Sequence, residues 1–417
     1  MPSPLQVFFN DSPVGRLWLE QDRTYVFQYD PSWLHNPMAI PLSISLPLGP
    51  EKLLGDVVRF FFANILPEGE LRDRVARQLG ISSQNVFDLL RELGGDCAGA
   101  LSVLPEGTNP DPRQGLYKPL TPAELAEIVG TLPRRPLLAG SEGIRLSLAG
   151  AQDKLPVHCE GDIISLPCNG APSTHILKPP IARLESTVIN EAFCMNLARN
   201  AGLPTPNCRV MQAGNIPLLM VTRYDRQRSG ERVLRVHQED FCQAMGISPE
   251  VKYQSEGGPG LWECVELLRK HSASPAKDVR LLARWCFANV LLGNADGHAK
   301  NLSLIYDQGK APRLAPFYDI ISTQAYDELS AKLAMKIGGE NRPEWIMKRH
   351  WERMAKDLGS KPKTLLQDLK AFCHTLETAI TPTMQALAPH GQDAAFLKRL
   401  ADNISRRIAT TLQVVCS

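Results

Sequence analysis

The hydrophobic pattern of this 417-residue chain changes its period near residue 240. Before that point, short apolar runs such as LQVFF, THILK and IPLLMV alternate with turn-forming residues, a pattern typical of strands. After it, apolar residues recur every three to four positions, as in helices. Two sets would each share one helical face: Leu365, Leu369, Phe372, Leu376 and Ile380, and then Phe396, Leu400, Ile404, Ile408 and Leu412. We therefore expect an α+β fold with a mainly helical carboxyl lobe.

A chain of this length exceeds what one hydrophobic core usually organises, so several packed parts are expected. Residues 1–105 begin with LQVFF and RLWLE around the turn-rich NDSPVG, which predicts an amino-terminal α+β accessory subdomain. Residues 106–140 are rich in proline and glycine and predict a connecting segment with one short helix. Residues 141–240 form a third part, whose helix from about Thr187 to Ala201 should stop at Gly202. Residues 241–417 complete the chain as the helical lobe.

Composition limits the class of protein. The chain is 43% hydrophobic and 22% charged, as in soluble globular proteins, and its net charge of +2 does not demand a nucleic-acid surface. The ten cysteines show no CxxC pair, which indicates reduced and mostly buried thiols. We find neither a signal-like amino terminus nor an apolar run long enough for a membrane helix, and expect a cytoplasmic protein.

A polar loop interrupts the apolar stretch between residues 291 and 320. The preceding DVRLLARWCFANVLL predicts a buried helix that ends at Gly293, with Gly297 also permitting the backbone to turn. Then LSLIY predicts a strand, DQGK a turn, and RLAPFY an antiparallel return. This hairpin would bring Asp319 beside Asn301.

The residue types in this loop suit phosphoryl transfer. Asn301 and Asp319 could bind one Mg²⁺ together with phosphate oxygens. Asp296 precedes Asn301 by five positions, the interval that separates base and metal ligand in the protein-kinase catalytic loop, and could accept a proton from a hydroxyl. His298 and Lys300 could contact the phosphates or steady the loop. The alternative is a structural loop in which Asp296 and Asn301 bind backbone donors.

Two upstream segments offer phosphate contacts. Lys178 ends the strand-like THILK, where an ammonium could neutralise ATP phosphates, and Glu191 on the next helix is a candidate partner. The alternative for both residues is a solvent-exposed position. In GIRLSLAGAQDKLPV, small residues would let backbone amides approach a phosphate, although the segment has no known glycine-rich motif. It could equally be a tight turn between two strands.

Eight segments in order resemble the HipA family of toxin serine/threonine kinases: RLSLAGAQDK, THILKPP, NEAFCMNLA, RYDR, HQEDFCQAMG, YQSEGGPG, GNADGHAKNLSL and APFYDIIS. The resemblance extends from about residue 144 to 336, and GGDCAGALSVLPEG resembles the accessory subdomain of that family. It implies a bilobal protein-kinase-like fold that binds ATP between its lobes. It also implies Asp296 as catalytic base, Asn301 and Asp319 as Mg²⁺ ligands and Lys178 as the ATP-phosphate lysine.

The resemblance implies a larger nucleotide site. Its residues are Ser147, Leu148, Ala149, Gly150, Ala151, Lys154, Lys178, Gln238, Glu239, Asp240, Phe241, His298, Lys300, Asn301 and Asp319. Residues 238–241 resemble the hinge that meets adenine, mainly through backbone groups. Ser147 matches a serine that relatives autophosphorylate, and a phosphoserine there would be repelled by ATP and leave the pocket. Asp153 stands where many relatives would have glutamate.

The resemblance further implies partners. They are a helix-turn-helix antitoxin similar to HipB, operator DNA reached mainly through that antitoxin, and a protein substrate such as an aminoacyl-tRNA synthetase, notably the glutamyl enzyme. No motif of the chain encodes that substrate.

Two other functions remain open, a small-molecule phosphotransferase and a catalytically silent scaffold in an antitoxin–DNA complex. The intact Lys178, Asp296, Asn301 and Asp319 argue against the scaffold, and the amino-terminal hundred residues, as a protein-docking module, argue against the small-molecule enzyme. A metal hydrolase is disfavoured because the nine histidines are scattered along the chain.

Overall fold

The structure is a computed structural model that describes residues 2–110, 116–230, 232–307, 311–388 and 391–416. The chain forms two compact units, each assembled from separate stretches of sequence. The first unit comprises Met1–Pro179, Met211–Glu250 and Leu304–Pro312. The second comprises Pro180–Val210, Val251–Ser303 and Arg313–Ser417.

An antiparallel five-stranded sheet in the order β4-β3-β2-β1-β5 begins the first unit. Its strands are β1 (Leu5–Phe9), β2 (Ser12–Leu19), β3 (Tyr25–Tyr29), β4 (Leu53–Leu54) and β5 (Leu101–Pro105). The predicted β1–β2 hairpin is confirmed, with Leu5 opposite Leu17, and its turn contains only residues 10 and 11. The helices of this region are α1 (Pro31–Leu34), α2 (Asp56–Ala63), α3 (Gly69–Leu79) and α4 (Val86–Leu93).

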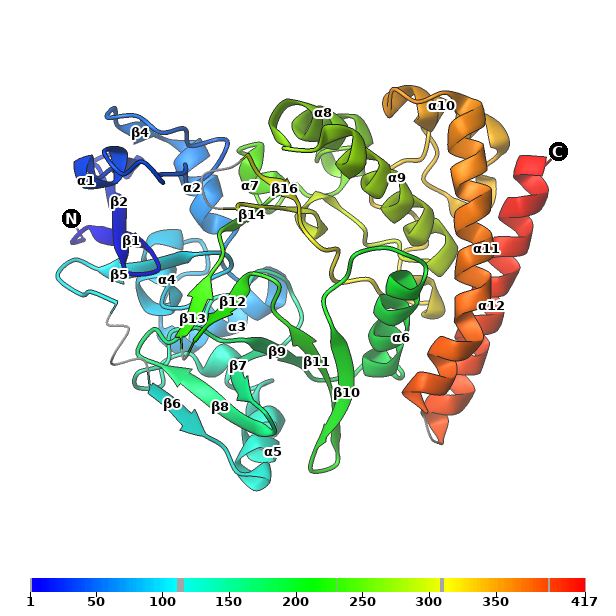
Figure 1. Ribbon diagram of the computed structural model, residues 1–417. Helices are drawn as coiled ribbons and strands as arrows, with labels where there is room; N and C mark the ends of the chain where they lie inside the picture. The colour runs from blue at the N-terminus through cyan, green and yellow to red at the C-terminus, as the bar shows by residue number, and fades with distance from the viewer. Residues whose placement is uncertain (1, 111–115, 231, 308–310, 389–390, 417) are drawn as a thin grey trace. The chain divides into compact units, whose positions relative to one another are not determined.

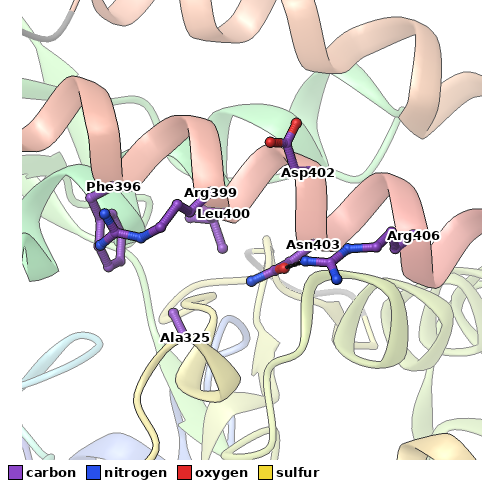
Figure 2. A pocket seen from close by; sticks show the side chains of 7 residues that line it. All are labelled: Ala325, Phe396, Arg399, Leu400, Asp402, Asn403 and Arg406. Atoms are coloured by element: carbon purple, nitrogen blue, oxygen red, sulfur yellow. Dashed lines mark hydrogen bonds between the residues drawn. The ribbon is translucent and has the colours of Figure 1, made fainter.

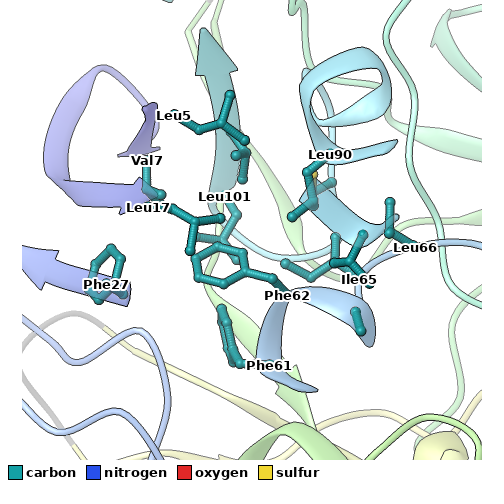
Figure 3. Close-up of a cluster of buried hydrophobic side chains, with 14 of the residues drawn as sticks. Leu5, Val7, Leu17, Phe27, Phe61, Phe62, Ile65, Leu66, Leu90 and Leu101 are labelled. Carbon is teal, nitrogen blue, oxygen red and sulfur yellow. The ribbon is translucent and has the colours of Figure 1, made fainter. Parts of the chain in front are cut away.

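The apolar face of this sheet packs on the helices in one hydrophobic core (Figure 3). Its fully buried side chains come from both layers and include Leu5, Leu17, Phe27, Phe61, Phe62, Leu66 and Leu90. Phe61 and Phe62 meet edge to face, with ring centroids 5.1 Å apart. The accessory region therefore has a core of its own.

A second sheet in this unit has six strands in the order β10-β11-β9-β7-β8-β6. They are β6 (Leu116–Pro119), β7 (Leu155–Glu160), β8 (Ile163–Cys168), β9 (His175–Lys178), β10 (Cys208–Ala213) and β11 (Ile216–Thr222). We expected residues 106–140 to form a connection, and residues 111–115 lie outside the described part. The remainder supplies β6, α5 (Pro122–Thr131) and η1 (Pro136–Leu138), and Leu125 and Val129 are buried in the core beneath this sheet.

The alternative interpretation of GIRLSLAGAQDKLPV as a tight turn between two strands is wrong, because residues 144–148 form no strand. This stretch makes only isolated parallel bridges, one between Leu146 and Asp96, and Gly150 makes another with Pro67. The bridge partners belong to two separate loops, so no continuous ladder of backbone hydrogen bonds can form. Residues 144–150 are therefore an extended segment that leads into β7. The turn that follows this segment has a strand, β7, only on its carboxyl-terminal side.

The first unit ends in short elements and a buried charge cluster. The elements are β12 (Arg226–Ser229), β13 (Arg232–Arg235), β14 (Gln238–Asp240) and α7 (Phe241–Ala244). The Asp96 carboxylate lies 2.9 Å from Arg226, 3.0 Å from Arg235 and 3.4 Å from Arg223. Burial alone would raise the pKa of Asp96, but Arg226, Arg223 and Arg235 outweigh it and hold the pKa below its usual range. Arg223 also pairs with buried Asp225 at 2.7 Å.

The second unit is mainly helical, as expected for the carboxyl part. Its helices are α6 (Thr187–Asn200), α8 (Leu261–His271), α9 (Pro275–Leu292), α10 (Lys348–Asp357), α11 (Pro362–Leu387) and α12 (Gln392–Cys416). The long helices α11 and α12 pack together (Figure 1). Their predicted apolar faces are confirmed, because nine of those ten side chains are buried and Leu412 is partly buried.

The predicted helix ends are confirmed at two glycines. Helix α6 has Ala201 as its C-cap, and Gly202 follows with φ +90°. Helix α9 is capped by Gly293 at φ +73°. Only glycine adopts this left-handed conformation without steric cost.

Short elements connect these helices. They are η2 (Gln254–Glu256), η3 (Ala299–Asn301), β15 (Ser303–Ile305), β16 (Arg313–Leu314), η4 (Thr323–Ala325) and η5 (Pro343–Trp345). Seven of the ten cysteines are buried, in line with the prediction of mostly buried thiols. In the described part of the chain we found no helix of the length and hydropathy that a membrane crossing requires.

Candidate active site

A loop after α9 carries the predicted base, and it is held from both sides. The Asn294 amide donates to the Asn289 carbonyl at 2.8 Å, which closes the helix end. The Ala295 amide donates to the Thr323 hydroxyl at 2.8 Å, and that hydroxyl reaches the Gly293 carbonyl at 3.3 Å. A Cβ atom at Gly293 would lie 2.8 Å from the Arg407 guanidinium carbon. The loop therefore leaves the helix in a tightly fixed direction.

Gly297 serves a purpose other than the predicted one. Its φ lies outside the left-handed region, but a Cβ atom there would collide with the side-chain amide of Asn289. Gly297 is thus required by the lack of space beside α9, and the unusual backbone angle belongs to Gly293 alone.

Asp296 lies at the open side of this loop. Its side chain is 47% exposed, and its backbone amide donates to the Asn294 side-chain oxygen at 3.1 Å. The Tyr253 hydroxyl donates to carboxylate oxygen Oδ1 at 2.5 Å, and His298 Nε2 lies 3.9 Å from the same oxygen. The carboxylate is therefore oriented by protein groups and still reachable from solvent.

Asn301 and Asp319 come together at the end of the predicted hairpin. The Asn301 side-chain amide donates to Asp319 Oδ2 at 3.2 Å. Backbone pairing supports this approach, since the Ala315 amide donates to the Ser303 carbonyl at 2.8 Å. The Tyr318 hydroxyl contacts the Lys300 carbonyl and the Ser303 hydroxyl, each at 2.8 Å. Residues 308–310 of the predicted DQGK turn lie outside the described residues.

The backbone of Asp319 is strained. Its φ is +59°, which side chains other than glycine rarely adopt and aspartate tolerates better than most. Such conformations persist where the surrounding structure enforces them, frequently at functional sites. In this conformation the Asp319 carboxylate accepts the Asn301 side-chain amide.

His298 lies close to Asp296, and Lys300 precedes Asn301 in the chain. Both side chains are buried, with 4% and 6% exposure. The His298 amide donates to the Asn301 side-chain oxygen at 3.3 Å, and its ring meets Tyr253 edge on, with centroids 5.4 Å apart. The second unit thus gathers Asp296, His298, Lys300, Asn301 and Asp319 in one short region of chain.

The donor set fits Mg²⁺. Asn301 and Asp319 can offer amide and carboxylate oxygens, the ligand types that Mg²⁺ prefers, and their side chains already lie 3.2 Å apart. The amide of Asn301 would have to present its oxygen to the ion.

The first unit contains the other predicted phosphate contacts. Lys178 ends β9 opposite Leu219 of β11, and its side chain is 9% exposed. Lys154 is also buried, and its ammonium donates to the Ala149 carbonyl. Glu191, the predicted partner of Lys178, is a buried residue of α6 in the second unit. That ion pair, and the gathering of Lys178 with Asp296, remain predictions.

The segment around Ser147 is clamped to the accessory region. Ser147 is fully buried, and its hydroxyl donates to the Ile65 carbonyl at 3.0 Å. Its amide donates to the Asp96 carbonyl at 3.1 Å. The Gly150 amide donates to the Glu68 carboxylate at 3.1 Å, and the Glu68 amide returns a bond of 3.1 Å to the Gly150 carbonyl. We call these contacts of residues 65–68 and Asp96 the Ser147 clamp.

The remaining residues of this segment differ in exposure. Leu148 is buried and Ala151 is exposed, whereas Gly150 has φ +107°, which favours glycine. Asp153 pairs with Arg74 at 3.0 Å.

The side chains of the predicted hinge, residues 238–241, are hydrogen-bonded to other protein groups or buried. Gln238 accepts a bond from the Tyr224 hydroxyl, Asp240 accepts one from the Gln243 amide at 2.9 Å, and Phe241 is fully buried. Glu239 is buried against the hydroxyls of Ser43 and Tyr306 and the Ile44 amide. Burial raises the pKa of Glu239 to about 7, although these hydrogen bonds oppose the rise. The contact of this segment with adenine, mainly through backbone groups, remains a prediction.

A separate cavity of about 200 Å³ lies between α12 and η4 (Figure 2). Its lining contains none of the predicted site residues: Ala325, Phe396, Arg399, Leu400, Asp402, Asn403 and Arg406. Sequence reasoning also missed Tyr253 and Thr323, which hold the Asp296 loop. A signal for Tyr253 existed in YQSEGGPG, whose glycines mark a constrained turn.

Comparison with known proteins gives consistent matches across the chain. A family model described as the HipA N-terminal domain matches residues 5–104, and one described as the HipA-like C-terminal domain matches residues 146–380. A Sinorhizobium fredii protein named "Putative kinase Y4mE" is 41% identical over 97% of both chains. The serine/threonine-protein kinase toxin HipA of Shewanella oneidensis is 30% identical over 94% of this chain and 92% of its own.

The fold is confirmed by a solved structure. The Shewanella oneidensis structure, described as a complex of HipA, HipB and operator DNA, superposes with a TM-score of 0.87 at 28% identity. The match covers 99% of this chain and 98% of the other. The expected α+β fold with a helical carboxyl part is therefore correct.

Proposed function

This chain belongs to the HipA family of serine/threonine-protein kinase toxins, and we propose that it transfers the γ-phosphoryl group of ATP to a protein hydroxyl. The observation that carries the proposal is the cluster in the second unit, where Asn301 contacts Asp319 at 3.2 Å and Asp296 is oriented but exposed.

In the proposed reaction, Asp296 accepts the proton of the attacking hydroxyl. The hydroxyl oxygen forms a bond to the γ-phosphorus of ATP while the bond to the ADP leaving group breaks. Lys178 pairs with the ATP phosphates, and the backbone of residues 238–241 contacts adenine. Asn301 and Asp319 would hold Mg²⁺, which when bound supplies positive charge against the phosphates.

We extend the proposal to regulation and partners. Ser147 is proposed as the autophosphorylation site, because it lies in the segment whose backbone would approach the phosphates. A HipB-like antitoxin is the proposed partner, with operator DNA reached through it. Support comes from the matched complex, which contains HipA, HipB and operator DNA. An aminoacyl-tRNA synthetase, such as the glutamyl enzyme, is the proposed substrate class.

The test is a transfer assay with radiolabelled ATP and Mg²⁺, using a panel of aminoacyl-tRNA synthetases and the isolated chain. Wild-type protein should label itself and one panel member, whereas Asp296→Asn should label neither, and mass spectrometry should find phosphate on Ser147. Labelling of small alcohols alone would favour a small-molecule phosphotransferase. Equal labelling by the wild type and Asp296→Asn would refute the role of Asp296.

A further inference from the structure

The YQSEGGPG segment contains none of the predicted site residues, yet its first residue, Tyr253, contacts the proposed base. We propose that Tyr253 is a positioning residue that fixes the Asp296 carboxylate for proton transfer. This inference rests on the proposed kinase function. Both residues belong to the second unit, so the contact does not depend on how the two units are arranged.

The contact between the two side chains is short and directional. The Tyr253 hydroxyl donates to Asp296 Oδ1 at 2.5 Å, within the range of strong bonds between a hydroxyl and a carboxylate. The Tyr253 ring stands edge on to His298 at an interplanar angle of 80°. Lys252 places its ammonium 5.5 Å from the Tyr253 ring centroid. These contacts restrict the tyrosine ring and with it the direction of its hydroxyl.

The backbone after Tyr253 is tied to the loop that carries Asp296. The Gln254 amide donates to the Ala334 carbonyl at 3.1 Å, and the Ala334 amide donates to the Ala295 carbonyl at 2.8 Å. The Gln254 side-chain oxygen accepts the Lys336 amide at 2.7 Å. Tyr253 and Asp296 are thus joined through the backbone as well as through their side chains.

The glycines of YQSEGGPG keep this segment compact. Gly257 has φ +93° and caps η2. A Cβ atom at Gly258 would lie 2.7 Å from the backbone of Val251 and Lys252, and one at Gly260 would lie 2.5 Å from the Gln254 side-chain nitrogen. Larger residues would displace the turn that presents Tyr253. The motif therefore has a physical explanation as a support for the tyrosine.

This arrangement has a chemical consequence for the reaction. A base must lie within hydrogen-bond reach of the proton it accepts, and a half-exposed aspartate otherwise samples several rotamers. Donation from Tyr253 to Oδ1 selects one rotamer and favours the ionised carboxylate, which is the form that can accept a proton. Two titratable groups stand at this carboxylate, the Tyr253 hydroxyl in contact with it and His298 Nε2 at 3.9 Å, and the Lys252 ammonium lies over the Tyr253 ring.

The test compares Tyr253→Phe with the wild type in autophosphorylation assays from pH 5 to 9. Loss of the hydroxyl should lower kcat about tenfold and move the acidic limb of the kcat profile up by about one pH unit, as expected for one lost hydrogen bond to a carboxylate. The KM for ATP should change less than about twofold, because Tyr253 is not proposed to touch nucleotide. The matched control is Tyr117→Phe, which loses a 3.0 Å bond from its hydroxyl to the Pro172 carbonyl in the first unit.

Each outcome decides between the proposals. A kcat and pH profile equal to wild type in Tyr253→Phe, with Asp296→Asn inactive, would overturn the role of Tyr253 and leave the kinase intact. A raised KM with an unchanged profile would also overturn it, by indicating a nucleotide contact. If wild type itself transfers no phosphate, the kinase proposal fails. Thermal denaturation shows whether either tyrosine variant is misfolded, and a folded Tyr253→Trp, which cannot place a hydroxyl at Oδ1, should repeat the Tyr253→Phe result.

Discussion

The Ser147 hydroxyl donates to the Ile65 carbonyl at 3.0 Å, and the Ser147 side chain is fully buried. A phosphate could not occupy this position, because the site offers a carbonyl oxygen as the partner and excludes water. Phosphorylation at Ser147 therefore requires the segment to leave the Ser147 clamp. The buried arrangement and the phosphorylated state are mutually exclusive.

Ser147→Asp should mimic this exclusion. An aspartate at the buried site faces the Ile65 carbonyl, and an unpaired buried carboxylate costs at least about 2 kcal/mol, so the segment should move outward. Hydrogen exchange of residues 144–151 should become faster, while Ser147→Ala should lose about 1 kcal/mol and keep slow exchange. Exchange in Ser147→Asp as slow as in the alanine variant would contradict the prediction.

The Ser147 clamp can also be weakened from the accessory region. Glu68→Ala removes the acceptor of the Gly150 amide, a loss of about 1 kcal/mol that should speed opening, and with it autophosphorylation, about fivefold. Glu68→Gln retains an acceptor oxygen and should behave nearly as wild type. Glu70→Ala alters an exposed residue of the same helix and serves as control. An unchanged rate of Ser147 phosphorylation in Glu68→Ala would show that opening does not limit the reaction.

Local pattern explains which parts of this structure the sequence could predict. Helix α6 and its end at Gly202 could be predicted from the apolar periodicity and one glycine, because both signals lie within the local sequence. Residues 144–148 form no strand, because Leu146 makes only one bridge, with Asp96 about 50 residues away, and the next bridge, between Gly150 and Pro67, involves a different loop. Nothing within the IRLSL stretch signals this.

In the candidate site, too, contacts within one hairpin could be predicted from the sequence and contacts between distant residues could not. The approach of Asn301 to Asp319 could be anticipated, because a hairpin brings its two ends together whatever the rest of the chain does. The contact of Tyr253 with Asp296 could not be anticipated, since the two residues stand 43 positions apart in the sequence, with α8 and α9 between them. The requirement for Gly297 likewise comes from the side chain of Asn289, and not from its own backbone angle.

The substitution Asp319→Asn tests the effect of the carboxylate charge without changing the backbone strain at this residue. Asparagine tolerates the left-handed region as well as aspartate, so the variant should keep its fold at φ +59° and lose only the negative charge of the proposed Mg²⁺ ligand. Phosphoryl transfer should fall at least about 100-fold at fixed Mg²⁺, and partial recovery at higher Mg²⁺ is expected. Asp319→Ala should be equally inactive and destabilised by about a further 1 kcal/mol. Full activity of Asp319→Asn would remove this residue from the proposed site.

Glu239 should make stability depend on pH. Its pKa is raised to about 7 by burial, from an ordinary value of 4.5, so the folded state binds more protons than the unfolded state between these values. The contribution of the protonated Glu239 to the free energy of unfolding is fully present below pH 4.5. It is lost as the pH rises through 7, and the free energy of unfolding falls by about 1.4 kcal/mol per pH unit in this range. Relative to wild type, Glu239→Gln should therefore gain stability as the pH rises from about 4.5 to 7.

His237 opposes this trend from two residues away. Burial lowers its pKa to about 4, so its contribution is present above 6.5 and is lost as the pH falls toward 4. The two effects partly cancel in wild type, which is why the comparison must use Tm differences between variant and wild type. Relative to wild type, His237→Gln should gain stability as the pH falls, because it lacks the buried histidine whose lowered pKa destabilises the wild-type protein at low pH. A Tm difference for Glu239→Gln that stays constant from pH 5 to 8 would refute the assignment.

Asp96→Asn should be the most destabilising of these substitutions. It would leave the guanidinium groups of Arg223, Arg226 and Arg235 buried with only the Asp225 carboxylate to balance them, and removing one partner of a buried ion pair costs about 3–5 kcal/mol. Because the pKa of Asp96 lies below its usual range, its stabilising contribution is present above the unfolded pKa of 3.8 and is lost only as the pH falls below it. The Tm loss in Asp96→Asn should thus be the same at pH 5 and pH 8, unlike the effect of Glu239→Gln. Glu106→Gln, which breaks an exposed 3.7 Å pair with Arg16, should change stability by less than about 1 kcal/mol and serves as control. A Tm loss for Asp96→Asn no larger than that of the control would show that the arginines are balanced by other means.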